Sequence, residues 1–261
     1  MRSFTFAVAY WLLSITYASG AAFAALAPGR GATSWIIRRY VKRMVQAMRV
    51  FAGITIQVRG RERLPQGAFI IASKHQSWGD GFATYDQFDD LAFVTGDHLE
   101  KFPLLGTVLK KLGAIVVNSC GGREARDSLQ QRGADAHAAG RKILIFPEGH
   151  LAKVGEKFRY RSGVWHMYRD FDMPVVPLAS NMGLFWPRED YRKNPGTATL
   201  EFLDPIPTGL PKDEFMARLE AVVEDKTAEL IAEATGKPVT PAVQIPWPGE
   251  AVSGKNAELR P

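Results

Sequence analysis

The sequence predicts an α/β protein with a mostly parallel sheet covered by helices, preceded by an N-terminal membrane-docking helical segment. After residue 53, short runs of β-branched and aromatic residues alternate with helical patterns. Before it, one charged side chain, Arg2, stands among the first 29 residues. A hydrophobic content of 46% over 261 residues is enough for a sizeable core. We expect membrane-associating helices over 1–52, the main domain over 53–236 and a Pro-rich tail over 237–261.

The first apolar run covers residues 3–29, which are 27 consecutive uncharged positions. As a helix it would extend about 40 Å, enough to cross a hydrocarbon core of about 30 Å. A cleaved secretory signal is the alternative, because Arg2, the apolar run and the small residues of "AAFAALA" also permit it.

Residues 30–49 carry six basic side chains and no acidic one. The positive-inside rule then predicts the inner (cytoplasmic) membrane as location, with everything after residue 30 on the cytoplasmic side. Ile37, Val41, Met44 and Met48 follow helical spacing between these charges. The pattern predicts an amphipathic helix in the headgroup layer; a core-facing helix with a solvated charged side is the alternative.

The main domain is predicted to contain seven strands and four helices. The strand segments are 54–58, 68–72, 91–94, 114–117, 143–146, 175–178 and 197–202, and the helices are 102–111, 123–140, 163–171 and 212–234. Ligands bind at the carboxyl ends of the strands in such sheets, so three polar clusters that follow strands are candidate site segments. They are "KHQSWGD" after 68–72, "NSCGGR" after 114–117 and "PEGH" after 143–146.

The first cluster places His75 and Asp80 five residues apart, in a predicted tight turn around Gly79. A carboxylate that folds back can accept the Nδ1 proton of the imidazole and leave Nε2 to take a proton from a hydroxyl. The chain has no G-x-S-x-G elbow, and nothing near Cys120 marks an activated thiolate. We therefore expect the substrate to supply the nucleophile: an alcohol, deprotonated by His75, attacks an activated acyl group.

Four ordered blocks resemble the glycerolipid acyltransferases typified by 1-acyl-glycerol-3-phosphate acyltransferase. They are "KHQSWGD", "LGAIVVNSCGGR", "FPEGH" and "MPVVPLA", spread over roughly residues 50–235. The resemblance implies His75 as general base, Asp80 as its orienting partner, acceptor binding by Glu148 and close backbone approach at Gly149. It also implies an acyl carrier protein or coenzyme A thioester as donor, membrane lipids as partners, and no bound cofactor.

The chain departs from the family pattern at two arginines associated with the acceptor phosphate. Ser119 and Leu151 stand at those positions, and neither can form the forked hydrogen bonds of a guanidinium. Either other basic residues reach the phosphate, or the acceptor is a different lipid, such as a lyso-aminolipid; an inactive relative is the remaining alternative. The replacement candidates are Arg123, Lys153, Lys157, Arg159 and Arg161. His150, beside Glu148, is included among the substrate-binding residues, with a structural role as the alternative.

Other function classes fit less well. A metal-dependent hydrolase could in principle use His75, Asp80, His98, Glu148 and His150. However, no H-E-x-x-H or Cys/His spacing is present, and we predict no metal. A non-enzymatic membrane adaptor has no chemical need for His75, Asp80 and Glu148 together. A net charge of +6 favours anionic partners, yet the basic cluster adjoins an apolar run and no nucleic-acid motif is visible, so we predict no nucleic-acid partner.

Overall fold

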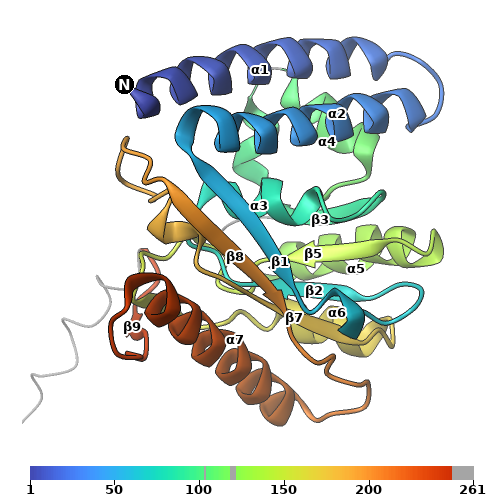
Figure 1. The fold of residues 1–261 in the computed structure, drawn as a ribbon. Coiled ribbons are helices and arrows are strands. Elements are labelled where there is room, and N and C mark those ends of the chain that lie inside the picture. The colour runs from blue at the N-terminus through green and yellow to red at the C-terminus, as the bar shows by residue number, and fades with distance from the viewer. Residues whose placement is uncertain (103, 118–121, 249–261) are drawn as a thin grey trace, which may run out of the picture.

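The computed structural model describes residues 1–102, 104–117 and 122–248, without the side chains of 122–126. A seven-stranded sheet forms its centre, in the order β1, β8, β7, β2, β5, β3, β4 (Figure 1). All neighbouring strands are parallel except β7 and β8, which are antiparallel. The strands are β1 (Ile54–Arg59), β8 (Gly196–Phe202), β7 (Val175–Ser180), β2 (Ile70–Ser73), β5 (Lys142–Ile145), β3 (Leu91–Gly96) and β4 (Ile115–Val117).

Helices cover both faces of this sheet. One face carries α1 (Arg2–Ala24), α2 (Gly31–Ala47), α3 (Trp78–Tyr85) and α4 (Leu105–Leu112); the other carries α5 (Gly122–Ala138), α6 (Gly163–Asp170) and α7 (Lys212–Thr235). The central strand β2 is a continuous apolar run because its side chains are buried on both faces of the sheet. Ile71 points into the core beneath α2 and α3, whereas Ile70 and Ala72 point into the core beneath α6 and α7.

These elements confirm the predicted fold class. Each of the seven predicted strand segments forms a strand of the sheet, and the four predicted helices correspond to α4, α5, α6 and α7. Within the described residues, the helix α3 and the strands β6 (Glu156–Phe158) and β9 (Val243–Ile245) were not predicted, nor were several short 3-10 and π-helical turns. The proposed domain limits stay a prediction.

The N-terminal helices lie side by side in a hairpin at one edge of the molecule (Figure 1). The hydroxyls of Ser14 and Tyr40 lie 2.8 Å apart and link α1 to α2. By length and composition, α1 is a helix long and apolar enough to cross a membrane. Its outer side exposes large apolar side chains: Phe4, Val8, Trp11, Leu12, Ile15 and Phe23.

The second helix differs from expectation. Its apolar side was predicted to lie in the lipid headgroup layer, but Val41, Met44 and Met48 are buried against the sheet in the protein core. That prediction was wrong because helical periodicity identifies an apolar side without saying whether protein or lipid covers it. The basic residues Arg39, Lys42 and Arg43 do lie on the exposed side of α2. Most of the outward apolar side chains of the hairpin therefore belong to α1, and Trp35 of α2 adds one more.

Candidate active site

The predicted clusters that the structure describes lie at the carboxyl edge of three adjacent strands. In the sheet, β2 is flanked by β7 and β5, and all three strands are parallel, so their carboxyl ends meet at one edge. His75 follows β2, the "FPEG" segment follows β5, and Ser180 ends β7. The cluster after β4, residues 118–121 with Cys120 and Ser119, lies outside the described residues.

His75 and Asp80 are brought together, with Nδ1 of the imidazole 3.4 Å from Asp80 Oδ2. The predicted tight turn is instead the first turn of α3. Ser77 is the N-cap of this helix, its Oγ accepts a hydrogen bond from Gly79 N–H at 2.9 Å, and Asp80 closes a capping box. The helix start, rather than a glycine turn, thus aims the carboxylate back at His75.

The Asp80 carboxylate is fully buried and accepts several hydrogen bonds. The backbone N–H groups of Gln76 and Ser77 both donate to Oδ2 at 2.8 Å, and Ser180 Oγ donates to Oδ1 at 2.9 Å. Such donors compensate a buried carboxylate for lost hydration and favour its charged form. With Nδ1 of His75 facing Asp80 as a donor, Nε2 is the nitrogen left to act as the base.

Contacts from the segment after β5 hold the imidazole and its backbone. The rings of His75 and Phe146 stack with centroids 3.8 Å apart and an interplanar angle of 19°. Ala152 N–H donates to the His75 carbonyl at 2.8 Å. The His75 side chain remains 18% exposed, so it is accessible while Asp80 behind it is not.

Glu148 does not face the open site. Its side chain is fully buried; Oε1 accepts the backbone N–H of His75 at 3.3 Å and Oε2 accepts that of Phe158 at 2.9 Å. Oε2 also accepts from Lys74 Nζ at 3.1 Å. Within the described residues, Glu148 therefore ties the His75 backbone to the segment after β5, and a direct contact with substrate stays a prediction.

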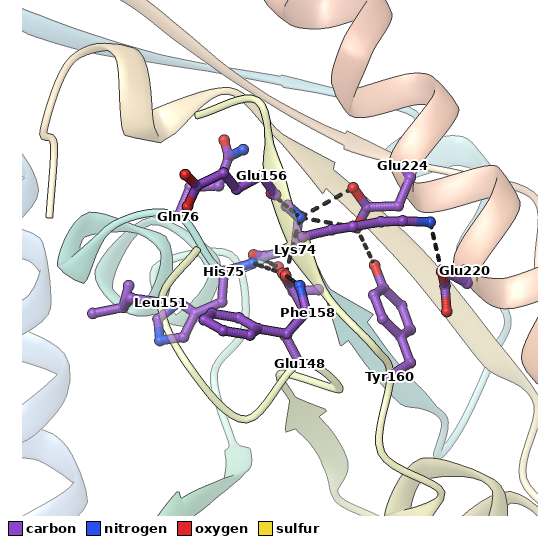
Figure 2. Close-up of polar contacts among 12 residues, drawn as sticks. Lys74, His75, Gln76, Glu148, Leu151, Glu156, Phe158, Tyr160, Glu220 and Glu224 are labelled. Atoms are coloured by element: carbon purple, nitrogen blue, oxygen red, sulfur yellow. Dashed lines mark hydrogen bonds and ion pairs between the residues drawn. The ribbon is translucent and has the colours of Figure 1, made fainter. Parts of the chain in front are cut away.

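Lys74 is the centre of a buried network that was not predicted (Figure 2). Its ammonium group donates to the Glu224 carboxylate in α7 at 2.9 and 3.0 Å and to the Glu156 carbonyl at 3.2 Å. Tyr160 Oη donates to Glu224 at 2.9 Å. A lysine directly after an apolar strand was a signal for such a site, but no sequence pattern pointed to a partner 150 positions away.

The network places two carboxylates, Glu148 and Glu224, beside one lysine, and this arrangement shifts the pKa of Glu148. Burial raises the pKa of Glu148 to about 7, with Glu224 acting in the same direction and Lys74 opposing both. Burial and the nearby Glu224 also hold the pKa of the Tyr160 hydroxyl well above its usual range. Near neutral pH, Glu148 is therefore close to its titration midpoint.

Gly149, His150 and Arg161 lie together beside this site. Gly149 has a positive φ of +70°, and a Cβ on it would lie 2.9 Å from Arg161 Nε. The group that lies close to Gly149 here is the Arg161 guanidinium, and the expected approach of substrate to its backbone stays a prediction. Arg161 Nη2 lies 3.3 Å from His150 Nε2. Burial, then Arg161 and Arg188, lower the pKa of His150.

The other predicted basic residues are divided among different surroundings. Lys153 pairs with Glu189 at 2.9 Å, and Lys157 pairs with Glu220 at 2.6 Å. Arg159 is exposed and lies over the Trp247 ring, with Cζ 4.9 Å from its centroid. The backbone of Arg123 lies in α5, but its side chain is outside the described residues. The structure thus brings Arg159 and Arg161, rather than the lysines, to one aromatic ring.

Leu151, at the position of a family arginine, is buried, and its carbonyl accepts a hydrogen bond from Arg188 Nη1 at 2.6 Å. Arg188 also lines a cavity of about 440 Å³ beside Gln76. The sequence analysis did not assign Arg188 or Ser180 to the site. Ser180 is the last residue of β7, and Arg188 follows that strand in the chain.

Among the described residues, no group of three or more His, Cys, Asp or Glu side chains is arranged to hold a metal ion. The expectation that the reaction needs no metal stays a prediction, and activity after chelation is its test.

Comparisons with known proteins agree with this geometry. Residues 55–181 match the family model described as Acyltransferase, and this stretch includes His75, Asp80 and Glu148. A 1-acyl-sn-glycerol-3-phosphate acyltransferase of Pseudomonas aeruginosa is 28% identical over 225 residues, covering 86% of this chain and 87% of the relative. A human 1-acyl-sn-glycerol-3-phosphate acyltransferase beta is 23% identical and covers 63% of this chain and 60% of its own length.

A solved structure shares the fold. The crystal structure of the 1-acyl-sn-glycerophosphate acyltransferase of Thermotoga maritima superposes with a TM-score of 0.71 at 19% identity, covering 89% of this chain and 98% of that one. The family match includes His75, Asp80 and Glu148, and the sheet that positions them is the shared one. Residues 55–181 therefore carry an acyltransferase domain, and the chain is an acyltransferase similar to the glycerolipid enzymes.

Proposed function

We propose that this enzyme moves a fatty acyl group from a thioester of acyl carrier protein or coenzyme A to the free hydroxyl of 1-acyl-glycerol-3-phosphate, forming phosphatidate. The observation that carries the proposal is the pairing of an accessible His75 with a buried, hydrogen-bonded Asp80 at the carboxyl edge of the sheet. Among its relatives, the Pseudomonas aeruginosa enzyme supports the proposal, because its name states that acceptor.

The reaction follows from the orientation of the imidazole. Nε2 of His75 takes the proton of the acceptor hydroxyl as its oxygen attacks the thioester carbonyl. The tetrahedral intermediate collapses, the carbon–sulfur bond breaks, and the thiolate takes the proton back from the imidazolium. Asp80 stabilises the imidazolium between these two steps. Every proton and electron pair is accounted for by the two substrates and one imidazole.

The acceptor is a membrane lipid, and α1 gives the enzyme a means to meet it. We infer that its exposed apolar side enters the bilayer while the cationic side of α2 faces anionic headgroups, with the catalytic domain on the cytoplasmic side. The hairpin is joined to the site region because Phe6 of α1 contacts Trp186 edge-on at 5.0 Å, and Trp186 stacks on Phe82 of α3 at 6.3 Å.

A lyso-aminolipid is the second candidate acceptor. The observation that favours it is Leu151, a buried apolar residue where the family has an arginine for phosphate. A headgroup without a phosphate monoester would not need that arginine.

A panel of lysolipids tests both proposals. Purified enzyme is assayed with acyl carrier protein and coenzyme A thioesters against lysophosphatidate, a lyso-aminolipid, other lysophospholipids and monoacylglycerol. Highest kcat/KM with lysophosphatidate supports the first acceptor, and highest kcat/KM with the lyso-aminolipid supports the second. Absence of transfer to every acceptor from both donors would overturn the proposed function.

A further inference from the structure

The C-terminal segment is attached to the same part of the chain that carries Arg159 and Arg161. Strand β9 (Val243–Ile245) pairs in parallel with β6 (Glu156–Phe158), with Val243 opposite Glu156 and Ile245 opposite Phe158. The Val243 N–H also donates to the Gly155 carbonyl at 2.9 Å. This pairing brings residues 246–247 beside the end of β6, where Arg159 and Arg161 follow.

Trp247 contacts both of these arginines. The guanidinium carbons of Arg159 and Arg161 lie 4.9 and 4.7 Å from the centroid of the indole ring, within the range of cation–π attraction. In the described part of the chain, the partner that the structure gives Arg159 is this ring rather than a carboxylate. An aromatic face fixes a guanidinium without neutralising its charge, so its N–H donors stay suited to an anion.

The position of Arg161 is defined from the active-site side as well. Its backbone N–H donates to the Pro147 carbonyl at 2.8 Å, and its side chain crosses Gly149 where a Cβ would lie 2.9 Å from Nε. The same segment places Phe146 on His75 with ring centroids 3.8 Å apart. The two arginines and the catalytic imidazole are therefore held by one short segment, residues 146–161.

A cavity of about 300 Å³ opens at Arg159, lined also by Gln244, Ile245, Pro246 and Trp247. Glu148, the carboxylate of this segment nearest to Arg161 in sequence, does not line it, because it is turned inward to Lys74 and fully buried. An anion that enters the cavity therefore meets the Arg159 guanidinium, whose charge the indole ring does not neutralise.

We propose that the segment Val243–Trp247 completes a subsite for the anionic headgroup of the acceptor, in which Trp247 holds Arg159 and Arg161 in place. This inference rests on the proposed function and gives it a specificity element that compensates for Ser119 and Leu151. A phosphate group could also come from the acyl donor. We assign the subsite to the acceptor because it is built from the segment that stacks on His75, the group that receives the acceptor's proton.

Steady-state kinetics of Trp247→Ala test the assignment. We expect KM for lysophosphatidate to rise about five- to tenfold, as loss of two cation–π contacts predicts, with kcat within about twofold of the natural enzyme. KM for the thioester donor and kcat/KM for uncharged monoacylglycerol should stay unchanged. Trp247→Phe should restore most of the acceptor affinity, because a phenyl ring retains a cation-binding face.

Trp165→Ala is the matched control. Trp165 in α6 also lies under an arginine, with Arg169 Cζ 4.7 Å from its ring, but it takes no part in the proposed subsite. It should leave KM for lysophosphatidate unchanged. An unchanged acceptor KM in Trp247→Ala, or a rise in donor KM instead, would overturn the proposal. A rise in acceptor KM with Arg188→Ala but not with Trp247→Ala would place the headgroup in the cavity beside Gln76.

A binding measurement separates this inference from the proposed function. Glycerol 3-phosphate, a soluble headgroup analogue, is titrated while the indole N–H signal of Trp247 is followed by NMR, with Trp247→Phe used to assign the signal. The natural chain should show a saturable shift that is lost in the double variant Arg159→Ala/Arg161→Ala. A missing shift contradicts the subsite even if acyl transfer occurs, whereas a shift without transfer to any lysolipid contradicts only the proposed function.

Discussion

Asp80 acts on two levels, as an N-terminal capping residue of α3 and as the carboxylate behind His75. Its hydrogen bonds to Gln76 N, Ser77 N and Ser180 Oγ are shorter than its 3.4 Å distance to the imidazole. The short bonds hold the carboxylate still, and the longer contact orients the imidazole. Because different contacts of Asp80 serve the fold and the catalysis, we expect substitutions at or beside Asp80 to change kcat and the unfolding free energy by different amounts.

Asp80→Asn should separate the two roles. An asparagine oxygen can accept from the two backbone N–H groups while its amide donates to Ser180 Oγ, so we expect the fold to survive. The amide cannot stabilise an imidazolium, and kcat should fall about 10²- to 10⁴-fold. Turnover and circular dichroism measure the two outcomes.

Ser180→Ala is the matched control, because it removes one donor to Asp80 and keeps the carboxylate. It should cost on the order of 1–2 kcal/mol of unfolding free energy with a much smaller loss of kcat. Equal losses of activity in Asp80→Asn and Ser180→Ala would show that Asp80 acts through packing alone.

Glu148 makes the stability of the protein depend on pH. Its pKa is raised from the ordinary value of 4.5 to about 7 in the folded chain, so between these values the folded state holds a proton that the unfolded chain has released. The contribution is fully present below pH 4.5 and is lost as pH rises through 7, with a span on the order of 3 kcal/mol.

Glu148→Gln removes this titration. Urea unfolding between pH 4.5 and 8 should show the free-energy gap between the natural chain and Glu148→Gln changing with pH, the natural chain losing stability as pH rises. Glu214→Gln, at an exposed position in the first turn of α7, is the control and should run parallel to the natural chain. A constant gap between the natural chain and Glu148→Gln would show that Glu148 is ionised throughout.

At the scale of elements, most of the sheet was predictable because its central parallel strands are buried on both faces and form continuous apolar runs. Helix α3 was not predicted, since Gly79 in "SWGDG" was interpreted as part of a tight turn. The overlooked signal was Ser77 followed three residues later by Asp80, a capping pattern. Packing explains the glycine at position 79, because a Cβ there would lie 3.1 Å from side-chain atoms of both Met182 and Trp186.

In the site, contacts between residues close in sequence were predictable, and contacts between distant segments were not. His75 and Asp80 are close in sequence, so their spacing was enough to pair them. Lys74 and Glu224 meet only because α7 packs beneath the carboxyl edge of the sheet. Trp247 lies in a tail without periodicity, and its contact with Arg159 depends on the pairing of β9 with β6. Long-range pairings of this kind leave no local pattern.

Helix α1 supports a prediction about membrane binding. Trp11 and Leu12 are 62% and 63% exposed on its outer side. Replacing both with glutamate should weaken sedimentation with anionic phospholipid vesicles at least about tenfold, because burying large apolar side chains in the interface contributes about 1.5–3 kcal/mol each. The unfolding free energy should change little, since neither side chain is buried in the protein.

The control for this experiment is Val239→Glu, which places a carboxylate at an exposed apolar position, 56% accessible, outside the hairpin. It should bind vesicles as the natural chain does. Undiminished binding of the Trp11/Leu12 variant would show that another surface holds the membrane.

The whole molecule combines two structural conditions for acylating a membrane lipid. The helical hairpin presents an apolar side outward, and the carboxyl edge of the sheet presents a partly exposed His75. Contacts from Phe6 through Trp186 to Phe82 join the hairpin to α3 as one packed unit. Membrane attachment and proton transfer are therefore carried by different residues and should be separable by substitution.

The most direct test of this account is acyl transfer by His75→Ala, measured on vesicles that contain lysophosphatidate, with sedimentation of the same samples to quantify bound enzyme. The account predicts a fall in kcat of at least about 10²- to 10⁴-fold with vesicle binding unchanged, because the proton acceptor alone is removed. A variant that remains bound and transfers acyl groups within about tenfold of the natural rate would contradict it.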